Sequence, residues 1–218
     1  MKNYLPLRFY FLGAFLSLIA YQFSTILFLL IFVPTLFVFF IFKQKDIRVE
    51  DFQRYGESAI FSPLTGTVLS IKRGIDHEVF GKNQTEIRVM IKYFDGYHLF
   101  FPFRGEVSDT IFSKGRSLFR EKREIEELAK YSKKEFLFKE INNQFHLGIS
   151  LIRCSTGLNP MTWIEVGDIG GPNGCFGIFP LGGTVVLYLD ESLLLRVREG
   201  DFIHATQSPL ASKATIAE

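Results

Sequence analysis

Two apolar segments hold the side chains whose type and setting could do chemistry. Thr184 is a nucleophile in principle, and it lies in residues 177–189, which read Gly-Ile-Phe-Pro-Leu-Gly-Gly-Thr-Val-Val-Leu-Tyr-Leu. His98 lies in residues 89–102, among many aromatic side chains. A lone histidine in such surroundings is more often a hydrogen-bonded core residue than a general base, so the residues alone leave both roles of His98 open.

The remaining histidines and both cysteines show no spacing typical of metal ligands, and no metal site is predicted. Cys154 and Cys175 are too few for a disulfide scaffold, so we expect buried thiols in a reducing compartment. The other histidines occur in unrelated contexts and are expected to be surface or structural residues: His77, His146 and His204.

Residues 177–189 resemble the processing site of phosphatidylserine decarboxylases, especially their short bacterial and archaeal form, where an aromatic-Gly-Ser segment leads into an apolar strand ending Leu-Tyr-Leu. In that family the serine hydroxyl attacks the carbonyl of the preceding glycine, and cleavage leaves a pyruvoyl group. This group forms a Schiff base with the substrate amine and serves as an electron sink. Here Gly182 stands at the position of the glycine and Gly183 at that of the serine. Glycine has no hydroxyl, so the resemblance implies that no pyruvoyl cofactor forms from Gly183.

Thr184 is the substitute nucleophile to weigh, because it is adjacent to Gly183. It would cut the chain one residue later and leave a ketobutyryl group, which carries an extra methyl. The sequence favours a degenerate member of the family that neither cleaves itself nor forms a cofactor.

Two further segments carry the resemblance. Residues 58–68 are similar to the family's Ser-Pro-x-Asp-Gly-x-Val turn, with Thr65 at the position of an aspartate that orients a histidine. Without the family, Pro63 and Gly66 simply indicate a hairpin corner. His98 matches the family histidine, although the spacings to Asp95 and Pro102 each differ by one residue. The resemblance thus implies a triad with its serine and its aspartate replaced.

The amino-terminal residues predict a membrane anchor. Residues 9–42 include no charged side chain. As one helix they would span about 51 Å, well beyond a hydrocarbon core of roughly 30 Å. Polar residues 21–25 and Pro34 interrupt the segment, so we expect a hairpin of two short membrane helices near residues 8–20 and 26–42. Basic residues on both flanks favour two cytoplasmic ends, and a single tilted span is the alternative.

The charge balance limits the partners of the rest of the chain. All 23 acidic residues and 23 of the 25 basic residues follow residue 42, so the formal net charge after the anchor is zero. A nucleic-acid binder would need a basic face, and we therefore expect no nucleic-acid partner. A lipid partner, either phosphatidylserine or an anionic bilayer, follows from the resemblance and the anchor, and a homo-oligomer stays open.

Periodicity gives the elements that must position these residues. Residues 116–134 have a helical period, which indicates a helix packed on a sheet or, alternatively, lying on anionic lipid. From residue 135 onward short runs with Gly-rich, Asn-Asn and Asp-Glu breaks predict strands. The Gly-Asp turn at residues 200–201 predicts a final hairpin, as in the decarboxylases and in lipoyl-like barrel-sandwich domains.

Together these patterns predict an α+β protein of two parts, a membrane anchor at residues 1–45 and a β-rich, barrel-sandwich-like decarboxylase-like domain at residues 46–218. The resemblance implies a role in phospholipid metabolism at the cytoplasmic membrane, with the domain on the cytoplasmic side and phosphatidylserine converted to phosphatidylethanolamine if the chain is active. The alternative is a non-enzymatic membrane-anchored adaptor or lipid-binding protein, although residues for coiled-coil arms are missing.

Overall fold

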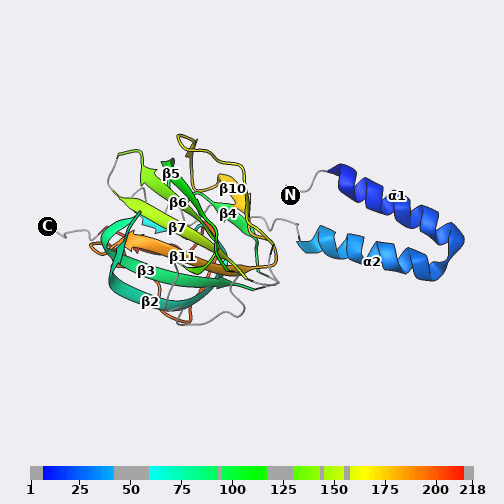
Figure 1. The fold of residues 1–218 in the computed structure, drawn as a ribbon, viewed down its shortest axis with the longest axis horizontal. Coiled ribbons are helices and arrows are strands. Elements are labelled where there is room, and N and C mark those ends of the chain that lie inside the picture. Colours follow the sequence, from blue (N-terminus) through cyan, green and yellow to red (C-terminus); the bar gives the residue numbers. More distant parts are fainter. Residues whose placement is uncertain are drawn as a thin grey trace. The chain divides into compact units, whose positions relative to one another are not determined.

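The structure is a computed structural model that describes residues 7–41, 59–92, 95–116, 130–142, 145–154 and 158–213. The chain separates into two compact units, Met1–Asp46 and Ile47–Glu218. The first unit contains two helices and the second is built from strands (Figure 1). The expectation of a β-rich protein with helices at its amino terminus is therefore confirmed.

The first unit is a helical hairpin of α1 (Leu7–Phe23) and α2 (Thr25–Ile41), each 17 residues long. Ser24 separates the helices, and its Oγ accepts a hydrogen bond from the amide of Ile26 at 3.2 Å, as a helix N-cap does. At Gly13 the helices approach closely, since a Cβ there would lie 2.6 Å from Cγ2 of Thr35. Among the residues that the structure describes, no helix is both long enough and apolar enough to cross a membrane.

The described residues of the second unit form one large sheet and two small ones, all with antiparallel pairing between their strands. The large sheet has eight strands in the order β13-β2-β3-β11-β7-β6-β5-β9, and the small sheets have the orders β4-β10-β8 and β1-β14-β12. The strands are β1 (Ala59–Phe61), β2 (Gly66–His77), β3 (Gly81–Ile91), β4 (His98–Phe100), β5 (Gly105–Ser113), β6 (Lys133–Glu140), β7 (His146–Arg153), β8 (Met161–Thr162), β9 (Ile169–Gly170), β10 (Cys175–Ile178), β11 (Gly183–Asp190), β12 (Leu194–Leu195), β13 (Phe202–Ile203) and β14 (Pro209–Ser212).

Both faces of the large sheet are buried around β11, whose residues 183–189 are all buried. On one face, Phe176 from the β4-β10-β8 sheet packs against Phe136 and Phe138 of β6, with ring centroids 5.7 and 5.3 Å apart. On the other face a separate core contains Phe80, Ile152, Val186 and Tyr188. A strand covered on both sides reads as a nearly continuous apolar run, which explains the composition of β11.

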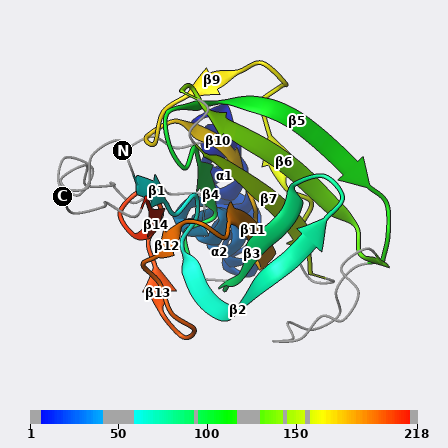
Figure 2. The ribbon, with the colours of Figure 1, turned by 90° about the vertical axis from the view of Figure 1, so that its left-hand side faces the viewer.

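The large sheet curls strongly from β5 through β11 to β2 (Figure 2). His77 on β2 lies 3.5 Å from the carboxylate of Glu135 on β6, although β3, β11 and β7 separate these strands in the sheet order. The end of the β2–β3 hairpin is therefore folded over the face that carries Tyr188, and the sheet forms a partial barrel around that face.

Three details of the sequence prediction need correction. The ends of the expected helix at residues 116–134 are wrong, because Arg116 bridges to Tyr131 and Lys133 already belongs to β6; residues 117–129 lie outside the described residues. The final hairpin is wrong, because β12 pairs with β14 and β13 pairs with β2. The corner at residues 58–68 is no hairpin, since β1 pairs with β14; residue 58 itself lies outside the described residues.

Neither Cys154 nor Cys175 forms a disulfide with a described residue, and each is only partly buried, whereas buried thiols were expected. The Sγ of Cys175 donates to the carbonyl of Gly177 at 3.4 Å. Neither cysteine belongs to a cluster that could hold a metal ion within the part of the chain that the structure describes.

Candidate functional site

The segments that carry the resemblance meet at one end of the large sheet. Gly183 opens β11 and pairs with Ile91 on β3, while the next residue, Thr184, pairs with Met90. Met90 also pairs with Thr67 of β2, so the segment after Thr65 lies in the same row of the sheet. The end of β3 leads within a few residues to β4 and His98.

The turn before β11 has an unusual backbone. Leu181, Gly182 and Gly183 have φ angles of 61°, 75° and 156°, in a region that favours glycine. A Cβ at Gly182 would overlap the carbonyl oxygen of Ile91. This turn therefore requires glycine at residue 182, which is the position whose carbonyl is attacked in the resembled family.

The serine position is closed to a side chain. A Cβ at Gly183 would lie 2.6 Å from Cζ of Phe179 and 2.8 Å from the carbonyl oxygen of Ile152. Real Cβ atoms do not approach so closely, so a serine here would force Phe179 and the strand backbone to shift. The glycine thus removes the hydroxyl and also lets the surrounding residues close over its place.

Thr184 is fully buried, and its Oγ1 has no hydrogen-bond partner within the described residues. An unsatisfied buried hydroxyl carries a desolvation penalty of about 1–3 kcal/mol. It lies directly after three residues with positive φ. The chemical capacity of this end of the sheet is therefore a desolvated hydroxyl beside a strained turn.

His98 lies on β4 and pairs with Ile178 on β10, the strand that leads into the turn. The contact is reinforced by the amide of Phe179, which donates to the carbonyl of Tyr97 at 2.7 Å. Burial lowers the pKa of His98 to about 4, so its imidazole is neutral at pH 7. A neutral imidazole can accept a proton, but burial opposes the charged product.

Thr65 lies against the same strand. The amide of Phe100, two residues after His98, donates to the carbonyl of Pro63 at 2.8 Å. A Cβ at Gly96 would lie 3.5 Å from the Thr65 Oγ1, which accepts a hydrogen bond from the amide of Ala205 at 3.1 Å. The Thr65 oxygen therefore serves the backbone, and no negative charge is available from this position to orient an imidazolium.

The structure thus brings all five predicted positions to one region: Thr65, His98, Gly182, Gly183 and Thr184. The residues at these positions offer a hydroxyl, a neutral imidazole and a glycine turn, with neither a serine nor a carboxylate at the two positions that the resemblance requires.

A polar cluster that the sequence analysis missed lies inside the partial barrel. The Oε1 atom of Glu135 accepts hydrogen bonds from Lys133 Nζ at 2.8 Å and from Ser150 Oγ at 2.6 Å, and it lies 3.5 Å from Nε2 of His77. Burial alone would raise the pKa of Glu135, but these hydrogen bonds outweigh burial and lower that pKa to about 2. Glu135 is therefore a charged, almost fully buried carboxylate.

A second buried ion pair joins this cluster. Arg88 Nε and Glu86 Oε1 are 2.6 Å apart on β3, with 4% of each side chain exposed. Burial, followed by the charge of Glu86, raises the pKa of Tyr188, whose hydroxyl interacts with that carboxylate. His77 stacks on Phe80 with ring centroids 4.4 Å apart. The sequence signal was present, because charged residues interrupt otherwise apolar strands, but only the curl of the sheet brings them together.

The comparisons with known proteins agree with the resemblance. No family model matches the chain. The chain is 23% identical over 193 residues to a protein of Syntrophotalea carbinolica named phosphatidylserine decarboxylase proenzyme, covering 88% of this chain and 86% of that protein. It is 20% identical over 178 residues to a protein of the same name from Syntrophus aciditrophicus, covering 82% and 80% respectively. These low-identity similarities extend over most of each chain and support a family relationship with the phosphatidylserine decarboxylases.

Proposed function

We propose that this chain acts in phospholipid metabolism as a membrane-associated relative of the phosphatidylserine decarboxylases that remains uncleaved and forms no pyruvoyl group. The observation that carries the proposal is the state of residue 183. A glycine stands there with a φ of 156°, and Phe179 and Ile152 leave no room for a side chain. Self-cleavage at that position needs a hydroxyl, and the closed packing has no place for one.

The proposed role of the uncleaved chain is to bind lipid at the cytoplasmic face of the cell membrane. Two groups of exposed apolar residues support this. The helices α1 and α2 expose many large apolar side chains, among them Phe11, Phe15 and Leu30. In the second unit, residues 158–169 expose five more: Leu158, Met161, Trp163, Val166 and Ile169. Concentrated exposed apolar residues mark interaction surfaces, and tryptophan favours the boundary between lipid and water.

A second candidate is an enzyme that uses Thr184. It is favoured by the buried Oγ1 of Thr184, which has no hydrogen-bond partner in the described residues, and by the positive φ angles of the three residues before it. In this alternative the hydroxyl attacks the carbonyl carbon of Gly183, and the Gly183–Thr184 peptide bond becomes an ester. Elimination then releases the Gly183 carboxylate and leaves a dehydroaminobutyryl end, which water converts to a ketobutyryl group with loss of ammonia. The side-chain methyl makes this group bulkier than pyruvoyl.

The deciding experiment is the mass of the purified full-length chain under denaturing conditions. We expect one species at 25.1 kDa. Two fragments whose junction lies between Gly183 and Thr184, the smaller with a carbonyl at its amino terminus, would overturn the proposal and identify the threonine enzyme. The variant Thr184→Val is the matched control, because it replaces the nucleophilic hydroxyl with a methyl group of similar size.

For the intact chain, flotation with lipid vesicles separates lipid binding from a role as a protein adaptor. We expect association with vesicles that contain phosphatidylserine. An intact chain that binds vesicles of no composition would contradict the lipid-binding role and favour the protein adaptor.

A further inference from the structure

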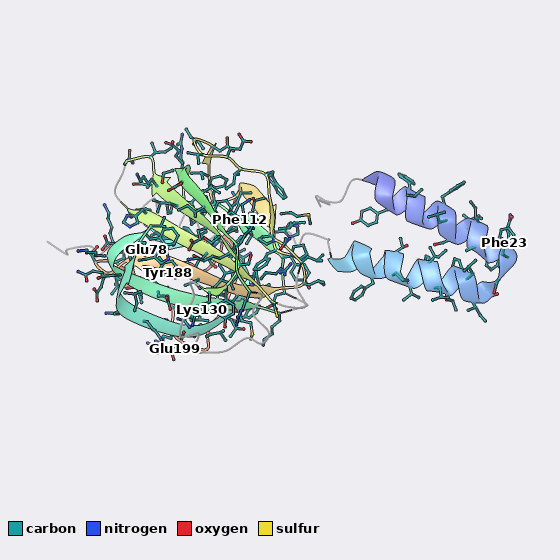
Figure 3. All side chains as sticks on the ribbon, in the orientation of Figure 1. Phe23, Glu78, Phe112, Lys130, Tyr188 and Glu199 are labelled. Carbon is teal, nitrogen blue, oxygen red and sulfur yellow. The ribbon has the colours of Figure 1, made fainter. Side chains whose placement is uncertain are left out.

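The partial barrel opens to a cavity of about 730 Å³ beside the buried polar cluster. Its lining comes from β2 and the turn after it and from β3, β5, β6 and β11. Figure 3 labels Glu78 and Tyr188 close together at this end of the large sheet. The volume is within the range of small-molecule sites, which often occupy the mouths of β-barrels.

The cavity is separate from the candidate site around residues 182–184. Thr184 and Tyr188 lie on the same face of β11, four residues apart, which corresponds to roughly 14 Å along a strand. Val186 lies between them on that face, Ile152 pairs opposite Thr184, and both belong to the buried core that also contains Phe80 and Tyr188. A ligand in the cavity would therefore contact Tyr188 and leave Thr184 covered.

The charged groups of the lining include both signs. The cations are Lys72, Arg88 and Lys133, and the anions are Asp76, Glu78, Glu86 and Glu135. The formal sum of these seven charges is close to zero, at −1. A ligand with a single charge would meet about as many like charges as opposite ones, whereas a ligand with both charges can be matched at two places.

Glu135 offers the clearest contact. All three of its donors, on His77, Lys133 and Ser150, approach Oε1. None of these three contacts involves Oε2, so that oxygen is the one left to accept a hydrogen bond from a ligand. Lys133 already offsets much of the charge of Glu135, and a ligand donor at the second oxygen would add to that compensation. An ammonium group can donate to that oxygen, and the ring of Tyr188, which also lines the cavity, attracts a cation.

The opposite charge has its own place. Arg88 occupies the same row of the sheet as Glu135, because Arg88 pairs with Val186, Val186 with Ser150, and Ser150 with Glu135. Their side chains share the inner face of the curled sheet, and Lys72 pairs with Glu86 at the rim. An anionic group can therefore be bound by a cation on the β2–β3 side while an ammonium contacts the β6 side.

We propose that this cavity binds a small zwitterionic metabolite of the amino-acid class, with the ammonium at Glu135 and the anionic group at Arg88 or Lys72. This goes beyond the role in phospholipid metabolism and does not depend on it, since the site needs neither the cleavage turn nor a lipid.

The test is a calorimetric titration of the full chain in detergent micelles with a matched set of probes. Glycine, 4-aminobutyrate and 6-aminohexanoate present the two charges at increasing separation, while butylamine and butyrate each present one of them. We expect saturable binding of at least one zwitterion, at least tenfold tighter than that of either single-charge probe. Failure of all three zwitterions to saturate up to about 10 mM would overturn the proposal, as would equal affinity for butylamine or butyrate.

Two variants localise the binding, and a third serves as their control. Glu135→Gln removes the charge and should weaken binding at least tenfold, while Glu140→Gln, a buried carboxylate on the same strand that lines a different cavity, should change it less than twofold. Ser113→Trp, at the edge of the cavity, should block binding with the polar cluster intact, and it decides the matter if Glu135→Gln does not fold. Unchanged binding in a folded Glu135→Gln or Ser113→Trp variant would place the ligand elsewhere and refute the proposal.

Discussion

Replacing Gly183 by serine tests whether the missing hydroxyl could simply be returned. In the structure, the new Cβ would lie 2.6 Å from Cζ of Phe179 and 2.8 Å from the carbonyl of Ile152, at a φ of 156°. A side chain at such a φ costs about 1–3 kcal/mol, and overpacking a buried site costs about 1–3 kcal/mol more. We therefore expect Gly183→Ser to lower the free energy of unfolding by roughly 2–6 kcal/mol, a large part of the 5–15 kcal/mol that is typical of a domain.

The assay is urea unfolding of the full chain, followed by fluorescence. Trp163 is the only tryptophan, and its indole donates to the carbonyl of Cys175 on β10, so it reports on the strand before the turn. Two other glycines separate the causes. Gly200 has a φ of 90° and open space around it, so the loss of stability in Gly200→Ser should report backbone strain alone. Gly171→Ser has open space and no unusual φ, and it should change stability by less than about 0.5 kcal/mol.

Two results would contradict this reasoning. If Gly183→Ser loses no more stability than Gly200→Ser, then Phe179 and Ile152 do not crowd the position, and the closed site is wrong. If Gly183→Ser cleaves itself, then a carboxylate at the position of Thr65 is dispensable, and the proposal of an incomplete triad fails. The expected result is a destabilised chain that keeps its full mass.

Three further predictions concern buried polar groups. Thr184→Val should raise the free energy of unfolding by about 1 kcal/mol in the same assay, because it replaces an unsatisfied buried hydroxyl with a methyl; a loss of more than about 1 kcal/mol would mean that the hydroxyl has a partner. Burial lowers the folded-state pKa of His98 from 6.5 to about 4. The stability that depends on its neutral imidazole is therefore fully present above pH 6.5 and is lost as the pH falls to 4. This linkage amounts to on the order of 3 kcal/mol, and His98→Phe should flatten stability between pH 6.5 and 4; an unchanged pH profile would contradict the assignment. Arg88→Met should destabilise the chain by about 3–5 kcal/mol because Glu86 stays buried without its cation, and the double variant with Glu86→Leu should recover part of that loss; additive losses would show that the pair is not coupled.

Local patterns predicted the elements well where one residue type dominates. The uncharged stretch with a polar break at residues 21–25 predicted two helices, and the structure has α1 and α2 on either side of Ser24. The apolar run after Gly183 predicted the strand that became β11. Such runs carry their own signal because burial on both faces leaves little freedom in composition.

Pairing between distant strands could not be predicted in the same way. The Gly-Asp turn at residues 200–201 correctly indicates a reversal, but β12 and β13 pair with other strands because tertiary partners decide where an edge is satisfied. At residues 116–134 the helical period competed with sheet pairing, and the described ends at Arg116 and Lys133 belong to strand-like contacts.

The candidate site divides in the same manner. The glycine at residue 183 could be recognised from the motif, whereas its crowding by Phe179 depends on the β4-β10 contact. His77 was expected to be a surface or structural residue, because nothing near it in the sequence indicates Glu135. Their contact arises from the curvature of the whole sheet, which no local pattern expresses.

The position of β11 has a consequence for how any cut in this chain would be seen. The strand is paired with β3 on one side and with β7 on the other along its length, and it is buried on both faces. A break just before it would leave the carboxy-terminal piece hydrogen-bonded in the middle of the sheet, so the two pieces would stay together as one particle. A nicked molecule and an intact one would therefore have the same size in gel filtration and the same native mass, and only unfolding would tell them apart.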